Sequence, residues 1–475
     1  MRLKELYLDH RVLKELTIPF TGEAPVAPGS DQAGYGLDFL VGVNGTGKST
    51  VLKALLTIFR HMEVNRAAPF PFRLEYALGT GEQRREVVVQ YERPAGESPR
   101  LITTVNGDEV PSPSEVVPKI IAFTTGGHAE WQEPEHDDRG TSPEEKQRGQ
   151  VRYIPPEDLP LVMLCGWLND IRSGGERPLR QTLQECGFER ITGFSLRFRL
   201  HSGRADVAEA DLIEFLAARG SRRLRMGTDR LIVFDLSDEQ AAAAGLFERF
   251  GTGQNLFENL AALKRPTDTG QPLLQEVNIF VERQRKRDRD ANPVGPVPDL
   301  HLFNWLSDGE QSFLGRMALF ALLGDSEALI LLDEPEVHFN DYWKREVVHH
   351  IHRALVGKNS HVLVTTHSSV ALTDVGKEHI RILHRDGSHT ERSEPPGIET
   401  FGAEPGDIMT HVFGTPETNG RHSTIEISRV LGMLAQDAPQ QRLVHLRAVE
   451  EWVAPGYWSY RIGREILRLE RERRR

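Results

Sequence analysis

Residues 37–59, "LDFLVGVNGTGKSTVLKALLTIF", decide the fold class of this chain. The apolar start is typical of a buried strand, and the pattern after residue 49 is typical of a helix. Between them, "GVNGTGKS" (42–49) fits the pattern G-x-x-x-x-G-K-[ST]. The backbone N–H groups of such a loop, together with the helix N-terminus, bind phosphate oxygens. The stretch therefore predicts a nucleotide-binding loop in an α/β protein.

The lysine and the hydroxyl side chains of this loop have separate predicted roles. Lys48 would reach the β- and γ-phosphates, and the Ser49 hydroxyl would ligate Mg²⁺. The other positions would contact phosphate through the backbone. The predicted nucleotide-binding residues are Gly42, Asn44, Gly45, Thr46, Gly47, Lys48, Ser49 and Thr50.

A second apolar run, "ALILLDEPEVHF" (328–339), ends in two carboxylates. An uninterrupted apolar run indicates a parallel strand that is buried on both faces, with Asp333 and Glu334 at its carboxyl end. Asp333 would hold Mg²⁺ through water, as a Walker B aspartate does. Glu334 would orient or deprotonate the attacking water. Without a glycine loop in the same chain, an Asp-Glu pair after a strand would be an ordinary loop start.

The next segment, "DYWKREVVHHIHRAL" (341–355), has a helical apolar face and leads into the strand-like "HVLVTTHSS" (361–369). The apolar face consists of Trp343, Val347, Val348, Ile351 and Leu355. This βαβ unit would bring His367 to the same sheet edge as Asp333, where it could bond the γ-phosphate. The trio His349, His350 and His352 has no carboxylate partners in the pattern. We therefore favour a solvated helix face over a metal site there.

The run "NWLSDGEQSF" (304–313) lies about 260 residues after the glycine loop and allows two interpretations. Ser307 and Glu310 can form a capping box at a helix start. That interpretation leaves Gly309 without a task. In the second interpretation the run touches a phosphate, and Gly309 allows the close approach. The two are compatible, because both use a helix N-terminus.

Composition excludes several classes of protein. The 475 residues are 39% hydrophobic and 27% charged, with a net charge of −11, which is ordinary for a soluble protein and poor for a dedicated nucleic-acid binder. No apolar run is long enough to span a membrane, so we expect no membrane among the partners of this protein. The N-terminus lacks the apolar core of a signal peptide. Two cysteines, Cys165 and Cys186, without metal-type spacing suggest a reducing, cytoplasmic location.

The chain divides by pattern into five segments. We expect a first ATPase lobe at 1–127, which combines the glycine loop with an antiparallel sheet, and a mobile polar loop at 128–159. An inserted, mainly helical lobe at 160–270 contains two strand-like runs, "FSLRFRL" and "RLIVFDL". A second ATPase lobe at 271–400 and a helical tail at 401–475 follow.

Taken together, "GVNGTGKST", "LSDGE", "LILLDEPE" and "TTHSS" occur in the order of ABC-type ATPases, and the chain resembles that family. Asp308, where transporters usually have glycine, and "DEPEVHF" resemble the RecF/SMC/OLD-related branch. Within it, "ETFGAEPGDIMTHVFGTPE" (399–417) is similar to the tails of ATPase subunits of bacterial restriction-associated and anti-phage systems.

The resemblance implies an ABC-type head, a mixed sheet flanked by helices plus an antiparallel β lobe, that uses ATP and Mg²⁺. It also implies a head-to-tail homodimer around two ATP molecules, with higher oligomers left open. In such a dimer the signature residues Ser307, Gly309 and Glu310 of one copy close over the nucleotide of the other. The implied catalytic residues are Glu334, His367 and Lys48, and the implied metal ligands are Ser49 and Asp333.

One family feature has no clear counterpart. A glutamine that helps to ligate Mg²⁺ normally follows the antiparallel lobe. The candidates Gln132 and Gln150 both lie in the expected polar loop. Either another residue replaces this glutamine, or the loop orders only when nucleotide binds.

Two hypotheses for function remain. In the first, the ATPase is a sensor or regulator in a prokaryotic anti-phage defence system and controls a separate effector, most simply a nuclease. In the second, it is a RecF-like DNA-repair ATPase that binds DNA directly. The local basic clusters "RGSRRLRMGTDR" (219–230) and "RERRR" (471–475) support the second hypothesis weakly, because such clusters are usually solvated.

Overall fold

The structure is a computed structural model, and it describes residues 1–25, 34–66, 68–92, 100–125, 131, 150–173, 175–199, 207–265, 271–284, 299–387, 389–415 and 419–474. The chain forms two compact units, Met1–Phe413 and Gly414–Arg475. Within the described residues, no helix combines the length and the apolar character that crossing a membrane requires.

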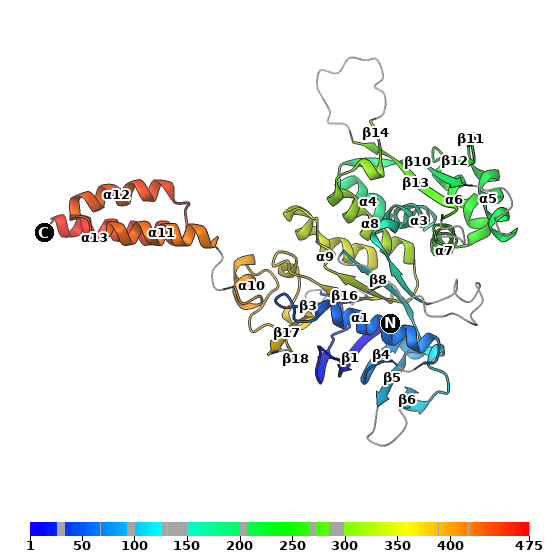
Figure 1. Cartoon of the computed structure of the whole chain (residues 1–475), viewed down its shortest axis with the longest axis horizontal. Coiled ribbons are helices and arrows are strands. Elements are labelled where there is room, and N and C mark those ends of the chain that lie inside the picture. Colours follow the sequence, from blue (N-terminus) through cyan, green and yellow to red (C-terminus); the bar gives the residue numbers. More distant parts are fainter. Residues whose placement is uncertain are drawn as a thin grey trace, which may run out of the picture. The chain divides into compact units, whose positions relative to one another are not determined.

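A seven-stranded sheet has the order β18-β17-β3-β16-β15-β8-β9. Several of its strands are labelled in the first unit in Figure 1. Its strands are β3 (Gly36–Val41), β8 (Lys119–Thr124), β9 (Val151–Ile154), β15 (Ala328–Asp333), β16 (His361–Thr365), β17 (Ile380–Asp386) and β18 (His389–Glu394). All pairings are parallel except β17 with β18. The carboxyl ends of β3, β16, β15 and β8 therefore meet at one edge, where ligands bind in open parallel sheets.

Both faces of this sheet are covered, which explains the uninterrupted apolar runs. Every residue of β3, β15 and β16 is buried. Leu329, Leu331 and Leu363 belong to one apolar core together with helix α1 (Lys48–Glu63). Their neighbours Ile330 and Leu332 belong to a second core, with α3 (Leu159–Arg172), α8 (Asp308–Leu323) and α9 (Asp341–Leu355). The α/β sheet-and-helix architecture predicted from the sequence is confirmed.

An antiparallel sheet lies beside this core, as the alternating patterns predicted. Its order is β2-β1-β4-β5-β6-β7, and the first two strands pair with each other. The strands are β1 (Arg2–Leu8), β2 (Leu16–Pro19), β4 (Phe72–Leu78), β5 (Arg85–Glu92), β6 (Arg100–Val105) and β7 (Asp108–Glu109). The sheet packs on α1 through the shared apolar core, and this packing fixes the helix that follows the glycine loop.

The segment expected to be mainly helical also contains a five-stranded antiparallel sheet, with the order β11-β12-β10-β13-β14. Its helices are α4 (Pro178–Glu185), α5 (Val207–Arg219), α6 (Glu239–Phe250) and α7 (Gly253–Leu263). Its strands are β10 (Phe188–Arg199), β11 (Arg222–Met226), β12 (Asp229–Asp235), β13 (Leu274–Arg283) and β14 (Leu300–Leu302). The two strand-like runs are β10 and β12, and their remaining partners come partly from beyond residue 270. The boundary expected at 270 therefore falls inside this sheet's sequence span.

The polar loop expected at 128–159 lies mostly outside the described residues. Of its described parts, Val151–Ile154 forms the edge strand β9, which pairs with β8, and Trp131 is buried. The indole ring of Trp131 stacks on Tyr153. At Trp131, Val151 and Ile154 the segment therefore differs from the expected mobile polar loop, because these side chains join the apolar cores.

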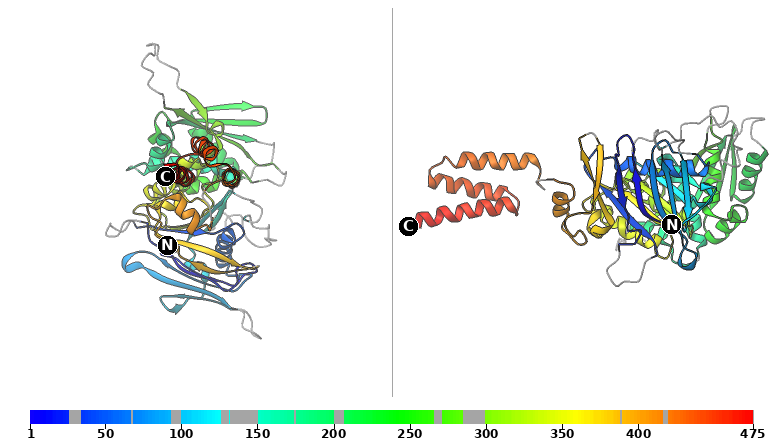
Figure 2. Two further views of the ribbon diagram at one scale, coloured as in Figure 1. Left: turned by 90° about the vertical axis from the view of Figure 1, so that its left-hand side faces the viewer. Right: turned by 90° about the horizontal axis from the view of Figure 1, so that it is seen from below.

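The tail is helical, but its division differs from the expected one. Helix α10 (Pro405–His411) belongs to the first unit, and α11 (Arg421–Leu434), α12 (Pro439–Trp452) and α13 (Tyr457–Arg474) form the second. Figure 2 shows these three helices side by side. Their small core consists of Leu443, Leu446, Ile462, Ile466 and Leu469.

Candidate functional site

The glycine loop connects β3 to α1, and its backbone requires glycine. Gly45 and Gly47 have φ angles of 83° and 84°, in the left-handed region. A Cβ atom on Gly42 would lie 2.9 Å from the Leu383 carbonyl oxygen. No side chain caps the N-terminus of α1, which begins at Lys48. The first N–H groups of this helix therefore face the loop without a side-chain partner and suit an anion.

Lys48 lies within this loop and is buried. Its Nζ donates a hydrogen bond to the Gly42 carbonyl oxygen at 3.0 Å. Burial lowers the pKa of Lys48, and the carboxylates of Glu334, Asp333 and Glu336 oppose that shift. The ammonium thus lies between the backbone of the glycine loop and the carboxylates at the end of β15.

Asp333 gathers hydroxyl groups from three directions at the sheet edge. Its Oδ1 accepts hydrogen bonds from Ser49 Oγ at 2.9 Å and Thr365 Oγ1 at 2.6 Å, and its Oδ2 accepts one from Thr124 Oγ1 at 3.0 Å. These oxygens are hard donors of the kind that Mg²⁺ prefers. No group of three or more His, Cys, Asp or Glu side chains that could hold a metal occurs among the described residues. One carboxylate and one hydroxyl therefore fit Mg²⁺ that is shared with a nucleotide.

Glu334 and His367 face each other beside Asp333. His367 Nε2 lies 3.3 Å from Glu334 Oε1. The hydrogen bond from His367 is the main cause that lowers the pKa of Glu334, which keeps its carboxylate ionised. Glu334 has a φ of 49°, and its N–H donates to the backbone oxygen and the hydroxyl of Thr365. A non-glycine residue in this region is strained, and the two bonds from the neighbouring strand hold it there.

Glu336 is a site residue that the sequence patterns did not single out. It is 7% exposed, and its Oε1 accepts hydrogen bonds from the His367 N–H at 3.0 Å and from the Thr366 hydroxyl. Burial raises its pKa. The available signal was the second glutamate in "DEPE", an acidic residue kept close to a buried strand. Glu336 fixes the backbone from which the His367 ring projects.

Arg316 joins the helix that follows the signature run to the same loop. This α8 residue is 1% exposed and donates from Nη1 to the Val337 carbonyl oxygen at 3.2 Å. Its guanidinium lies over the rings of Phe123 and Phe339, 5.3 and 4.8 Å from their centroids. Burial lowers its pKa to about 9. Arg316 therefore links the middle of α8 to the loop after β15.

The signature run forms the predicted capping box. The Ser307 hydroxyl accepts from the Glu310 N–H, and the Glu310 carboxylate accepts from the Ser307 N–H. Gly309 also has a task within its own chain, which corrects the sequence argument. A Cβ atom there would lie 2.8 Å from the His338 carbonyl oxygen.

The outer side of the signature run is open. Trp305 is 71% exposed, and Ser307 and Asp308 are exposed as well. Within the described part of the chain, no hydrogen bond or ion pair joins the run to the glycine loop. The structure thus brings Lys48 and the Asp333 group together in one chain but leaves Ser307 and Gly309 apart from them.

The expectation of a solvated histidine trio is wrong for His350. His350 is buried, its Nδ1 hydrogen-bonds the Thr182 hydroxyl at 3.0 Å, and its ring packs edge-on against Phe313. His352 bonds the Tyr35 hydroxyl, and only His349 is exposed. Helical periodicity explains this, because position 350 shares the inner face of α9 with Val347 and Ile351.

Of the two candidates for the missing glutamine, only Gln150 belongs to the described residues, and it does not contact the site. Gln132 lies outside the described residues, and Gln150 precedes β9, where its N–H bonds the Glu63 carboxylate. The end of β8 instead supplies Thr124, bonded to Asp333, and Thr125, whose hydroxyl donates to the Glu334 carbonyl oxygen at 3.4 Å. At this end of β8, hydroxyl groups and not an amide contact Asp333 and Glu334.

Residues 270–374 match a family described as "AAA domain, putative AbiEii toxin, Type IV TA system". The match covers the signature run, the carboxylates after β15 and His367. Together with the glycine-loop geometry, it supports an ATPase of the AAA type.

Solved structures with a similar chain course include SMC heads. The SMC head domain from Thermotoga maritima is 14% identical, and the match covers 84% of this chain and 100% of that chain with a TM-score of 0.36. The Smc head of Pyrococcus furiosus, bound to the C-terminal domain of ScpA, is also 14% identical, over 83% and 96% of the two chains, with a TM-score of 0.35. Likenesses this distant say nothing about the activity of this protein.

Proposed function

We propose that this protein hydrolyses ATP at a site that a second copy completes, and that the ATP-closed dimer controls a separate effector in an anti-phage defence system. One observation carries the proposal. Lys48, Asp333, Glu334 and His367 gather at one sheet edge, whereas Ser307 of the signature run is exposed and hydrogen-bonds Glu310 of the same run.

The groups of this chain divide the chemistry among themselves. The loop N–H groups and Lys48 bind the phosphates and stabilise negative charge on them. The Glu334 carboxylate accepts a proton from water as the water oxygen bonds to the γ-phosphorus and the bond to ADP breaks. His367 holds Glu334 in place and contributes to orienting that water. Mg²⁺, held by Ser49 and Asp333, would neutralise phosphate charge.

The second copy would supply the signature run. The N-terminus of α8 carries the positive end of the helix dipole, which favours contact with a γ-phosphate. Trp305 gives this surface an exposed aromatic side chain of the kind enriched at interfaces. Val43, in the glycine loop, is also exposed. Two apolar side chains beside the two halves of the site fit a surface that a second copy covers.

The defence role is supported by the matched family, whose description names a putative toxin and a type IV TA system. No cluster of metal-binding side chains typical of a nuclease occurs among the described residues. A separate effector therefore agrees with the chemistry of this chain better than a built-in one.

Sedimentation velocity with ATP, with ADP and without nucleotide tests the dimer. We expect ATP to shift the protein to a dimer, and Trp305→Ala to weaken that association roughly tenfold or more. Phe401→Ala, another exposed aromatic position, is the matched control. A monomer at every ATP concentration that still hydrolyses ATP at full rate would rule out the shared site.

Expression of the chain with its neighbouring open reading frames, followed by plaque counts, tests the defence role. We expect protection from phage that requires both the ATPase and one neighbouring frame. Protection from phage by the ATPase alone would contradict control of a separate effector. So would a lack of protection whichever neighbouring reading frame is expressed with the ATPase.

A further inference from the structure

We propose that the outer face of helix α13 is a binding site for single-stranded nucleic acid. The face, called the α13 stripe, consists of Tyr457, Tyr460, Arg461, Arg464, Arg468 and Arg471. All six side chains are exposed, and they frame a surface hollow of about 790 Å³. Their spacing of three or four residues places them along one side of the helix.

The stripe lies outside the apolar core of its own unit. The opposite face of α13 supplies the core residues Ile462, Ile466 and Leu469. Tyr457 and Tyr460 are 65% and 66% exposed, although large aromatic side chains usually find cover. An ordinary solvated helix face does not need them.

The charge of this unit differs from that of the rest of the chain. Residues 414–475 contain 11 basic and 8 acidic residues, whereas residues 1–413 contain 47 and 61. Helix α13 itself has six arginines and three glutamates. A positive surface of this kind is complementary to a polyanion.

The nearby acidic side chains do not neutralise the stripe. Glu465 pairs with Arg442 of α12 at 2.7 Å as well as with Arg468, and Glu470 pairs with Arg447 of α12 at 2.6 Å. Glu472 lies 3.9 Å from Arg468. Arg464 and Arg471 have no acidic partner among the described residues.

The dimensions suit one strand. From Arg461 to Arg471 the helix rises about 15 Å, at 1.5 Å per residue. That distance spans roughly four phosphates at the 3.4 Å axial spacing of one strand. The two exposed tyrosines select the unpaired form, because bases stack on aromatic side chains only when they are not paired and stacked in a duplex.

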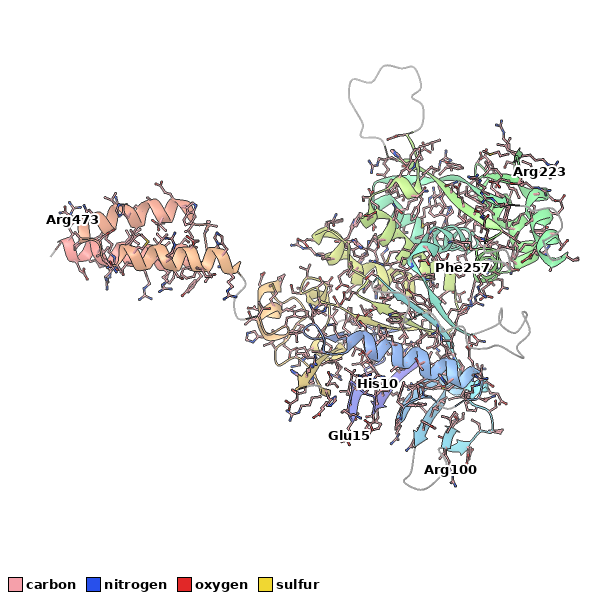
Figure 3. All side chains as sticks on the ribbon, viewed as in Figure 1. His10, Glu15, Arg100, Arg223, Phe257 and Arg473 are labelled. Carbon is pink, nitrogen blue, oxygen red and sulfur yellow. The ribbon has the colours of Figure 1, made fainter. Side chains whose placement is uncertain are left out.

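A second basic surface, on edge strand β11, has a simpler explanation. Arg222, Arg223 and Arg225 are exposed, and Figure 3 shows Arg223 projecting outward from the sheet. Charged side chains on an open edge prevent the edge from pairing with another chain. Strand β11 is such an edge, whereas α13 has none to protect.

Fluorescence anisotropy of labelled 20-nucleotide oligo(dT) and oligo(rU) with the full chain tests the site. Four phosphate contacts predict a salt slope of about −2.8, a loss of roughly 50-fold between 50 and 200 mM KCl. The Arg464→Glu/Arg471→Glu double variant should halve that slope. Tyr457→Ala/Tyr460→Ala should weaken binding roughly 5- to 150-fold per stacked base and leave the slope unchanged. The two probes distinguish DNA from RNA.

Arg222→Glu/Arg225→Glu on β11 is the matched charge control and should leave binding unchanged. All of these side chains are exposed, so circular dichroism should show unaltered helix content. The proposal fails if neither oligonucleotide binds at 50 mM KCl, or if the β11 variant and not the α13 variant loses binding. It also fails if the α13 variants change only self-association in sedimentation, since the stripe would then hold a second copy.

Discussion

The hydrolytic edge of the sheet and the signature run differ in how far one chain completes them. At the sheet edge, Lys48, Asp333, Glu334 and His367 are linked by hydrogen bonds and charge within a single chain. The signature run bonds mainly to itself, and its outer side chains face solvent. The difference is the basis of our proposal that one copy holds the catalytic groups and that a second copy closes over the nucleotide.

Glu334→Gln should have the largest effect on ATP turnover. It changes the sheet edge and leaves the signature run unaltered. Loss of a general base typically lowers turnover 10²- to 10⁴-fold. ATP binding should persist, because the glycine loop and Lys48 are untouched. Single-turnover hydrolysis and equilibrium binding of ATP measure the two quantities separately, and sedimentation should show an accumulated ATP-bound dimer. Near-normal ATP hydrolysis by Glu334→Gln would show that Glu334 is not the general base.

Glu336→Gln sharpens the comparison, because Glu336 only positions the neighbouring His367. The amide can still accept from the His367 N–H, but it replaces a buried carboxylate acceptor that also binds the Thr366 hydroxyl. We expect kcat to fall roughly 10- to 100-fold with little change in KM. Asp341→Asn, an exposed change in the next helix, is the control. A change in KM alone would show that Glu336 acts on nucleotide binding instead.

Much of the hydrolytic region was predictable because its residues act through local sequence. A glycine loop, a strand ending in Asp-Glu and a strand followed by histidine each place their side chains by short-range geometry. Glu336 and Arg316 were missed because their roles depend on contacts between β15, β16 and α8, which only the folded sheet creates. Gly309 was interpreted too narrowly, since its packing against His338 is a tertiary contact.

The inserted sheet was underestimated for a related reason. Strand β10 pairs with β13, which lies about 80 residues later in the chain. The local sequence of a short strand does not predict which distant strand it will pair with. Helical periodicity for α9 was correct, but the same periodicity buries His350, and polarity alone had suggested a solvated face.

His350→Gln should have the smallest effect on turnover and a clear effect on stability. Burial lowers the pKa of His350 to about 4, despite Glu185 at 3.3 Å; Arg353 and His349 lower it further. Between the ordinary value of about 6.5 and 4, the unfolded chain binds a proton that the folded chain does not. The free energy of unfolding should therefore fall as the pH drops through this window, by about 2 kcal/mol at pH 5.

Urea unfolding at pH 7 and pH 5 measures this contribution. The glutamine amide can still hydrogen-bond the Thr182 hydroxyl, and the variant should lack that part of the pH dependence. His349→Gln, on the exposed side of the same helix, should behave like the wild type. An unchanged pH dependence in His350→Gln would show that the buried imidazole does not contribute.

Mixing two inactive variants tests the shared site most directly. Lys48→Ala disables the glycine loop, and Asp308→Tyr places a bulky ring on the exposed signature without the intrachain clash expected at Gly309. Half of the dimers formed on mixing are mixed, and each has one complete site, so ATP turnover should recover to about a quarter of wild type. A mixture that stays inactive, or Asp308→Tyr alone hydrolysing ATP at the wild-type rate, would contradict a site built from two copies.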